Sequence, residues 1–119
     1  MALTIYHYPK CGTCRKAIKW LEERGKTLEK IDIALNPPSA EQLCQWKEAS
    51  GLDLKTFFNT SGQVYREMNL KEKRDQMSEE EQLDLLASNG MLIKRPIVTD
   101  GKRVTVGFRE QQFEEVWGT

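Results

Sequence analysis

Apolar positions recur with two different periods in the first third of the chain. Residues 3–8 (LTIYHY) are rich in β-forming side chains, and residues 28–33 return to a similar strand-like pattern. Between them, residues 14–25 carry apolar side chains at helical spacing, and Gly25 is suited to end a helix. The helical positions are Cys14, Ala17, Ile18 and Leu21. This stretch therefore predicts a β-α-β order.

The middle of the chain, residues 39–89, loses the strand pattern and gains helix start signals. A capping-box spacing, with a short polar residue three positions before Glu or Gln, occurs three times: Ser39 with Gln42, Asn69 with Glu72, and Ser78 with Glu81. Gly51 and the pair Asn89–Gly90 are suited to helix ends. These signals predict several short helices over this range.

The pattern returns to β-structure after residue 96. Residues 97–99 and 103–108 predict two strands joined by a DGK turn, with Val104, Val106 and Phe108 on one face of the second. Residues 109–118 then predict a helix. The whole order is βαβ, a helical insertion and ββα, which is typical of an α/β thioredoxin-like fold with a mixed sheet flanked by helices. We expect one domain over residues 1–119, with the insertion at about residues 39–89.

Composition narrows the function classes. The 119 residues are 39% hydrophobic and 30% charged, and 18 basic side chains balance 18 acidic ones. A balanced charge gives no overall attraction to nucleic acid or to an anionic membrane, so we expect no direct contact with either. The sequence has neither a membrane-spanning apolar run nor a signal peptide at its start, which predicts a cytoplasmic protein.

Two of the three cysteines, Cys11 and Cys14, lie where the first strand gives way to the first helix. Free amide groups and the dipole at a helix N-terminus stabilise a thiolate, and the neighbouring cations Lys10 and Arg15 act in the same direction. Cys11 is then the nucleophile, and Cys14 is the resolving thiol of a redox-active disulfide. No cofactor is needed for this chemistry.

Two other interpretations of the cysteine pair remain open. A zinc site needs about four ligands, and only Cys44 and His7 remain to complete one, so we expect no metal. The pair could also be two buried structural thiols. His7 is either a structural histidine or a group that tunes the Cys11 thiolate, and Cys44 is either a packed side chain or a third redox thiol.

Three segments in order, YHYPKCGTCRKA, NPPS and IKRPIV, resemble the ArsC/Spx family of thioredoxin-like proteins, and the match spans nearly the whole chain. The resemblance implies that Cys11 attacks a bound oxyanion, that Arg95 helps to bind it, and that His7 is the family's histidine near the thiol. It also implies a cis Arg95–Pro96 peptide bond. The remaining substrate-binding positions are then Lys10, Gly12, Thr13, Arg15 and Pro96.

The family has two branches, and each implies different partners. An arsenate reductase-like thiol oxidoreductase would act on a small-molecule oxyanion or on a protein or low-molecular-weight thiol, with glutaredoxin or thioredoxin as electron donor. Those enzymes typically carry an arginine in the insert where this chain has Asn59, and Arg66 and Arg109 are the candidate substitutes. Spx-type regulators use the cysteine pair as a redox switch and bind the RNA polymerase α-subunit, with a glycine that Gly51 matches. The oxidoreductase is our first hypothesis and the regulator is the alternative.

Overall fold

The computed structural model describes residues 2–118, and it divides the chain into two compact units. Residues 2–32 and 95–118 form the first, which we call the sheet unit. Residues 33–94 form the second, which we call the insert unit. Each unit has its own buried residues and is described by itself.

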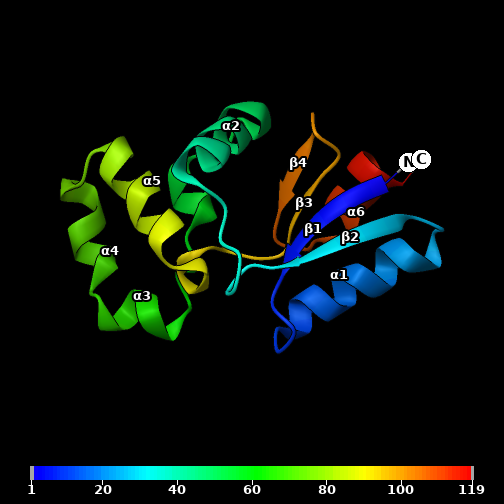
Figure 1. The fold of residues 1–119 in the computed structure, drawn as a ribbon, viewed down its shortest axis with the longest axis horizontal. Helices are drawn as coiled ribbons and strands as arrows, with labels where there is room; N and C mark the ends of the chain where they lie inside the picture. The colour runs from blue at the N-terminus through cyan, green and yellow to red at the C-terminus, as the bar shows by residue number, and fades with distance from the viewer. Residues whose placement is uncertain (1, 119) are drawn as a thin grey trace. The chain divides into compact units, whose positions relative to one another are not determined.

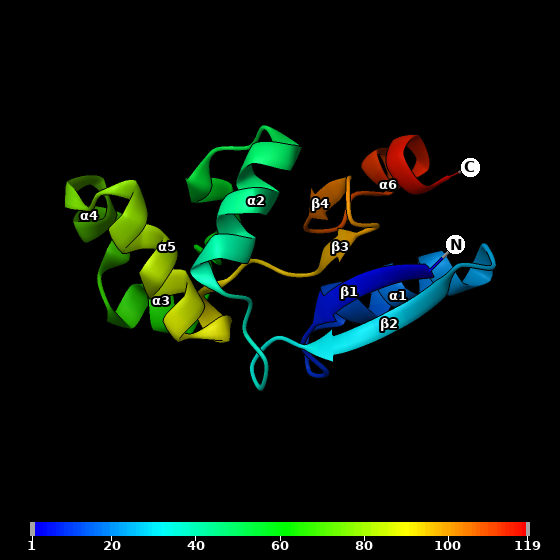
Figure 2. The ribbon, with the colours of Figure 1, turned by 45° about the horizontal axis from the view of Figure 1, so that its top comes forward.

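The sheet unit is built on a four-stranded mixed sheet with the order β2-β1-β3-β4 (Figure 1). β1 (Ala2–His7) pairs in parallel with β2 (Thr27–Asp32), and the two strands run side by side in Figure 2. β1 also pairs antiparallel with β3 (Ile97–Thr99), which in turn pairs antiparallel with β4 (Val104–Val106). The thioredoxin-like fold expected from the order of elements is confirmed.

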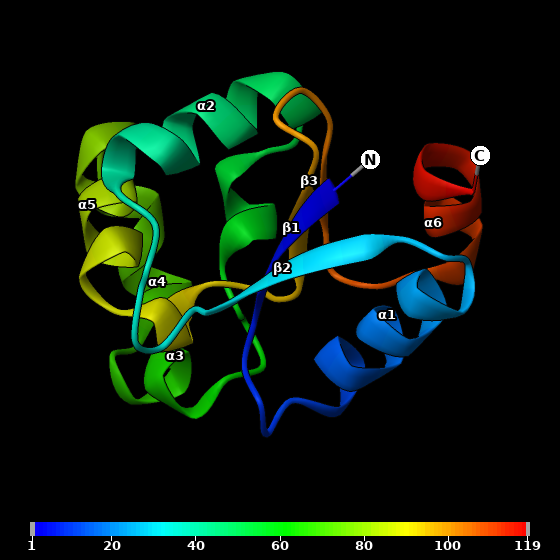
Figure 3. The same ribbon diagram turned by 45° about the vertical axis from the view of Figure 1, so that its right-hand side comes forward.

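Two helices of the sheet unit share one core. α1 (Gly12–Glu23) and α6 (Glu110–Trp117) lie next to each other in Figure 3, and the Trp20 and Phe113 rings meet edge to face at 5.4 Å. The buried cluster draws on both helices, β1 and β3: Leu3, Ile5, Ala17, Trp20, Leu21, Val98, Phe113 and Trp117. This burial fixes α1 against the sheet and therefore fixes where its N-terminus lies.

The last strand differs from the expected one. β4 ends at Val106 because Gly107 adopts a positive φ of 82° and donates its N–H to the Pro96 carbonyl at 2.8 Å. The expected apolar face is only partly correct, since Val106 is buried whereas Val104 and Phe108 are half-buried. Thr105, between the two valines, is almost completely buried, and its hydroxyl accepts a hydrogen bond from Trp117 Nε1 at 3.1 Å.

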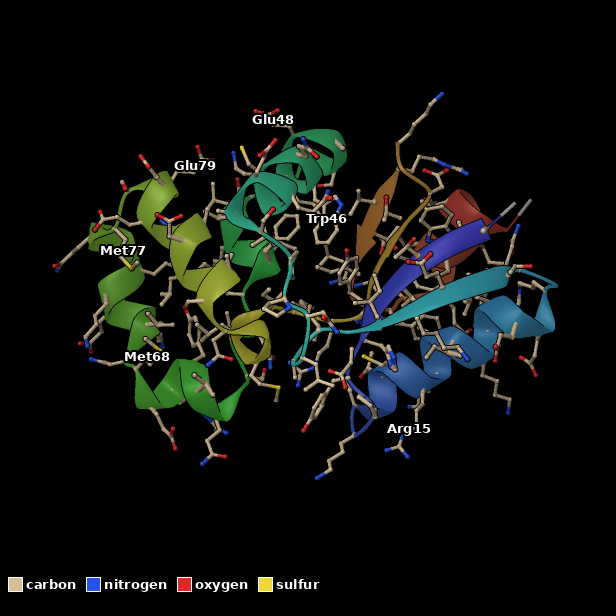
Figure 4. All side chains as sticks on the ribbon, in the orientation of Figure 1. Arg15, Trp46, Glu48, Met68, Met77 and Glu79 are labelled. Carbon is tan, nitrogen blue, oxygen red and sulfur yellow. The ribbon has the colours of Figure 1, made fainter. Side chains whose placement is uncertain are left out.

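The insert unit consists of short helices, as the sequence predicts. In chain order they are α2 (Ala40–Ser50), η1 (Leu54–Phe57), α3 (Gln63–Glu67), α4 (Leu70–Lys73), η2 (Arg74–Gln76), α5 (Glu79–Ser88) and η3 (Gly90–Leu92). Trp46 on α2 and the first turn of α5 at Glu79 are labelled in Figure 4. Lys47 on α2 forms an ion pair with Glu79 at 2.6 Å. The unit buries aromatic and aliphatic side chains, including Leu43, Trp46, Phe57, Phe58, Tyr65, Leu86 and Ile93.

Two of the three expected capping boxes have capping contacts. The Ser39 hydroxyl accepts from the Gln42 amide at 3.1 Å, and the Ser78–Glu81 box makes both of its hydrogen bonds. Asn69 does stand at the N-cap of α4, but its side chain makes no capping hydrogen bond. Its backbone is left-handed, with φ 54°, and its side-chain amide donates to Glu72 Oε2 at 3.1 Å instead.

The glycines at the expected helix ends have two different roles. Gly51 closes α2 with a left-handed φ of 70°, as expected for a helix C-terminus. Gly90 does not end α5 in this way, because it begins η3 and lies against the backbone of Ile33. A Cβ atom at position 90 would overlap the Ile33 carbonyl, so this position needs glycine for close approach.

Within residues 2–118, no helix is long and apolar enough to cross a bilayer.

Candidate active site

Cys11 is the N-cap residue of α1. Its backbone is extended, with φ −87° and ψ 114°, and its sulfur accepts a hydrogen bond from the Cys14 amide at 3.4 Å. The sulfur therefore occupies the place that a Ser or Asp oxygen takes in an ordinary helix cap. The Cys11 amide donates to the Tyr8 carbonyl at 2.9 Å, which closes the loop between β1 and α1. The strand, the loop and the helix core together direct the sulfur towards the free amides of the first turn.

The two thiols have opposite protonation preferences. Partial burial by itself favours the neutral Cys11 thiol, but hydrogen bonds from the Cys14 thiol and amide, the Arg95 charge and the Thr13 amide outweigh it, so the Cys11 pKa lies below its ordinary value. Burial is the largest cause that raises the pKa of Cys14 to about 12, and the hydrogen bond and charge of Cys11 add to it, whereas the Tyr8 backbone and Arg95 act against it. Cys14 is thus a proton donor that stabilises a Cys11 thiolate.

Arg95 lies at the start of the segment that leads into β3. Its guanidinium is 5.2 Å from the centre of the Tyr8 ring, within the range of a cation–π interaction. The positive charge of Arg95 helps to lower the Cys11 pKa. The peptide bond between Arg95 and Pro96 is cis, as the resemblance implied. The structure thus brings Arg95 and Cys11 into one electrostatic environment.

His7 ends β1 and is paired in register with Asp32 on β2. Burial lowers the pKa of His7, with Lys30 acting in the same direction and Asp32 against it. His7 is therefore neutral at neutral pH and able to accept a proton. The charges that act on it come from β2, so a role in tuning Cys11 stays a prediction.

The other expected substrate-binding residues surround the loop. Lys10, Gly12, Thr13 and Arg15 are exposed, whereas Pro96 is buried. Arg15 projects away from α1 in Figure 4, and it lines a shallow hollow of about 460 Å³ together with Ile18, Lys19, Glu22 and Glu23. Their assignment to substrate binding stays a prediction, as does the catalytic assignment of Cys11, Cys14, Arg95 and His7.

The third cysteine, Cys44, belongs to the insert unit, whereas Cys11 and Cys14 belong to the sheet unit. Cys44 is half-buried on α2 of the insert unit. Among residues 2–118, the structure contains no group of three or more His, Cys, Asp or Glu side chains that could hold a metal ion. All three cysteines are free thiols.

Comparison with known proteins identifies the family. The ArsC family model matches residues 6–116, which is nearly the whole chain. The chain belongs to the ArsC family. A protein named YusI from Bacillus subtilis (strain 168), described as uncharacterized, is 69% identical over 117 residues, covering 98% of this chain and 99% of that protein.

Two further relatives represent the two branches of the family. The crystal structure of a possible arsenate reductase from Streptococcus mutans UA159 has a TM-score of 0.86 and 47% identity, and covers 94% of this chain and 97% of the other. The global transcriptional regulator Spx of Enterococcus faecalis is 31% identical over 110 residues, covering 92% of this chain and 82% of the regulator. The ArsC/Spx resemblance read from the sequence motifs is confirmed.

Tyr8 is the residue at this site that sequence reasoning did not single out. Its ring faces Arg95, its carbonyl accepts from Cys11, and its backbone acts on the Cys14 thiol. The available sequence signal is an aromatic residue placed three positions before the nucleophile and next to the loop proline, Pro9.

Proposed function

We propose that this protein is a thiol-disulfide oxidoreductase of the arsenate reductase type, with Cys11 as nucleophile and Cys14 as resolving thiol. The observation that carries the proposal is the opposite shift of the two thiol pKa values at the N-cap and first turn of α1, where the Cys11 pKa is lowered and the Cys14 pKa is raised. A thiolate is the attacking form of cysteine, and the buried partner supplies the second sulfur. Membership of the ArsC family supports the same class of chemistry.

The reaction with a disulfide substrate proceeds in two exchanges. The Cys11 thiolate attacks one substrate sulfur, the substrate S–S bond breaks, and the other sulfur leaves as a thiolate that takes a proton from water. Cys14 then loses its proton and attacks the Cys11 sulfur, which releases the second substrate thiol and forms the Cys11–Cys14 disulfide. The substrate gains two electrons, and a dithiol of the thioredoxin or glutaredoxin class returns them to the protein.

The raised pKa of Cys14 fits this order of events. The charge and hydrogen bond of Cys11 are among the causes that hold the Cys14 pKa high. Once Cys11 is in a mixed disulfide it has no negative charge, so this part of the shift disappears and Cys14 becomes easier to deprotonate. Neutral His7 is the proposed proton acceptor at this stage, and Arg95 stabilises the thiolate form of either sulfur.

The proposed substrate site is the β1–α1 loop with its flanking cations. Lys10 and Arg15, the amides at Gly12 and Thr13, and Pro96 would contact a small oxyanion or an extended thiol substrate. Such thiol chemistry needs the reducing environment of the cytoplasm to regenerate the pair.

A trapping experiment tests the thiol assignments. Wild-type protein treated with glutathione disulfide should form the Cys11–Cys14 disulfide, whereas Cys14→Ser should stop at a glutathione adduct on Cys11. Peptide mapping by mass spectrometry locates both products, and Cys44→Ser serves as the matched control with the wild-type outcome. A stable adduct on wild-type Cys11, or an adduct of Cys14→Ser on Cys44 instead, would contradict the proposal.

Arsenate reduction is expected to be weak. Asn59 occupies the place of the insert arginine, Arg66 is exposed on α3, and Arg109 is exposed at the start of α6. Fewer positioned cations mean fewer charge-assisted hydrogen bonds to a divalent oxyanion, each contributing about 1.5–3 kcal/mol. A steady-state assay with thioredoxin or glutaredoxin as donor measures this, and fast turnover would show that another cation replaces the missing arginine.

The alternative is a redox-sensing regulator of the Spx type. The similarity to Spx proteins supports it, and the family resemblance then implies binding to the RNA polymerase α-subunit through the region of Gly51. In this alternative the same cysteine pair acts as a switch and does not turn over a substrate.

A further inference from the structure

Tyr8 contacts the arginine and both cysteines of the site from one position in the loop. Its ring centre is 5.2 Å from the Arg95 guanidinium carbon. Its carbonyl oxygen accepts from the Cys11 amide at 2.9 Å, and its backbone stabilises the ionised form of Cys14. A single residue thus contacts the Arg95 cation, the Cys11 backbone and the Cys14 thiol.

The pairing of β1 with β3 explains why Tyr8 and Arg95 meet. β1 and β3 are antiparallel, with Ile5 opposite Val98 and Tyr6 opposite Ile97. Tyr8 directly follows β1 and Arg95 lies just before β3, so the antiparallel pairing of these strands brings both residues to the same end of the sheet. The 5.2 Å separation of the Arg95 guanidinium from the Tyr8 ring centre lies within the range of a cation–π contact.

We propose that Tyr8 is a positioning residue for the thiol chemistry, whose ring holds the Arg95 guanidinium beside the Cys11 sulfur. This inference rests on the proposed function, because it concerns the same nucleophile. It adds a residue whose role is to fix the location of the positive charge.

The chemistry of an aromatic ring suits this role. Arginine has a long side chain, and holding it in one place costs rotamer entropy unless a partner offsets that cost. An aromatic ring attracts the cation without carrying a countercharge, so this contact leaves the positive charge of Arg95 available to Cys11. The Coulomb attraction between Arg95 and a Cys11 thiolate falls with distance and with solvent exposure, so holding the guanidinium nearby preserves it.

The test is the pH dependence of Cys11 alkylation by iodoacetamide. A Cys44→Ser background leaves the buried Cys14 as the other thiol, and mass spectrometry assigns the adduct. Tyr8→Leu should move the profile to higher pH and slow alkylation below the pKa about two- to fivefold, the factor that corresponds to one cation–π interaction. Tyr8→Phe keeps the ring and should stay within about twofold of the parent at each pH.

A double variant shows whether the effect passes through Arg95. Arg95→Gln alone should slow alkylation at least as much as Tyr8→Leu, and adding Tyr8→Leu to it should have no further effect. Tyr8→Met, whose unbranched and flexible side chain adapts more easily to the space left by the ring, replaces the leucine variant if that protein melts early. The proposal is overturned if Tyr8→Leu and Tyr8→Met both leave the pH profile of alkylation unchanged. It is also overturned if Tyr8→Phe shifts the profile as much as Tyr8→Leu does, or if Tyr8→Leu slows alkylation by its full factor in the Arg95→Gln background.

The outcome is independent of the trapping experiment. Alkylation needs no substrate and no resolving thiol, so it reports on the Tyr8–Arg95–Cys11 arrangement even if the protein turns over no disulfide. If glutathione disulfide forms no Cys11–Cys14 disulfide but alkylation of Cys11 still depends on the Tyr8 ring, only the proposed function is rejected. An intact disulfide with a ring-independent profile would reject the role of Tyr8 alone.

Discussion

The two units are organised differently: in the sheet unit, the reactive side chains lie at the ends of strands that are far apart in the sequence but paired in the sheet. In the insert unit, the buried side chains lie on short helices that follow one another along the chain. In the sheet unit, Cys11 and Cys14 follow β1 and Arg95 precedes β3. In the insert unit, side-chain caps at Ser39 and Ser78 begin the two longest helices. The first unit is therefore organised around a site, and the second around its own packing.

This difference separates the two functional hypotheses. The proposed thiol-disulfide exchange involves only residues of the sheet unit, namely Cys11, Cys14, Arg95, His7 and Tyr8. The regulator hypothesis needs a binding surface near Gly51, which belongs to the insert unit. Substitutions placed in one unit at a time can therefore test the hypotheses separately.

The largest contrast is expected between Cys11 and Cys44. Cys11→Ala removes the nucleophile and should lower the rate of disulfide exchange about a thousandfold or more, to the uncatalysed background. Cys44→Ala changes a half-buried thiol in the insert unit and should leave the rate within about twofold. Reduction of glutathione disulfide under a thioredoxin-coupled assay measures both rates. A comparable loss in both variants would make Cys44 a third redox thiol.

The second contrast concerns stability and compares two glycines. Gly90→Ala places a Cβ against the Ile33 backbone, and backbone cannot move aside as a flexible side chain can. Overpacking of this kind should cost about 3 kcal/mol and lower the melting temperature by roughly 10 °C. Gly12→Ala has open space around the added Cβ and a backbone that needs no glycine, so its melting temperature should stay within about 2 °C.

Hydrogen exchange sharpens the same comparison. Both Gly90 and Ile33 belong to the insert unit, so faster exchange in Gly90→Ala should be strongest over residues 33–94. Uniform acceleration over the whole chain would show that the two units unfold as one. A melting temperature equal to that of Gly12→Ala would instead show that the Ile33 carbonyl can relax.

The order of helices and strands along the chain follows from local signals, and those signals predicted it well. The apolar spacing of α1 and the Ser78–Glu81 box depend on residues within one or two turns of each other. Asn69 was predicted correctly as the start of a helix, but its left-handed backbone and missing capping hydrogen bond are not encoded in the spacing of side chains. The helix end at Asn89–Gly90 was also predicted correctly, since Asn89 is the C-cap of α5. The reason that position 90 needs glycine depends on Ile33, which is distant in sequence.

The candidate site was also predictable from the sequence only where it depends on neighbouring residues. The cysteine pair at a helix start is a local pattern, and it is enough to single out Cys11 as the candidate nucleophile. Tyr8 and Arg95 meet because β1 and β3 pair, and the pattern of a single sequence does not state which strands pair. Local sequence order suggested Lys10 and Arg15 as the cations beside the thiol, and only the family resemblance pointed to Arg95. In the structure, Arg95 is a cation that lowers the Cys11 pKa.

The smallest expected effect is at Gly51, and it decides between the two functions. Gly51 is exposed at the end of α2, and its φ of 70° favours glycine for a reason that concerns the helix alone. Gly51→Arg should therefore cost about 1 kcal/mol of stability through backbone strain and leave disulfide exchange unchanged. Gly51→Asn is the matched control, because asparagine tolerates the left-handed conformation and adds no charge.

A pull-down with the C-terminal domain of the RNA polymerase α-subunit then separates the hypotheses, in reduced and oxidised states. We expect no specific retention by wild type, Gly51→Asn or Gly51→Arg, because the balanced charge and the organised thiol site both favour an oxidoreductase. If wild type and Gly51→Asn are retained and Gly51→Arg alone is not, the loss comes from the bulk and charge of arginine, provided that the melting temperature shows the Gly51→Arg protein to be folded under the assay conditions. That result would assign the insert unit a binding surface and make the Cys11–Cys14 pair a switch.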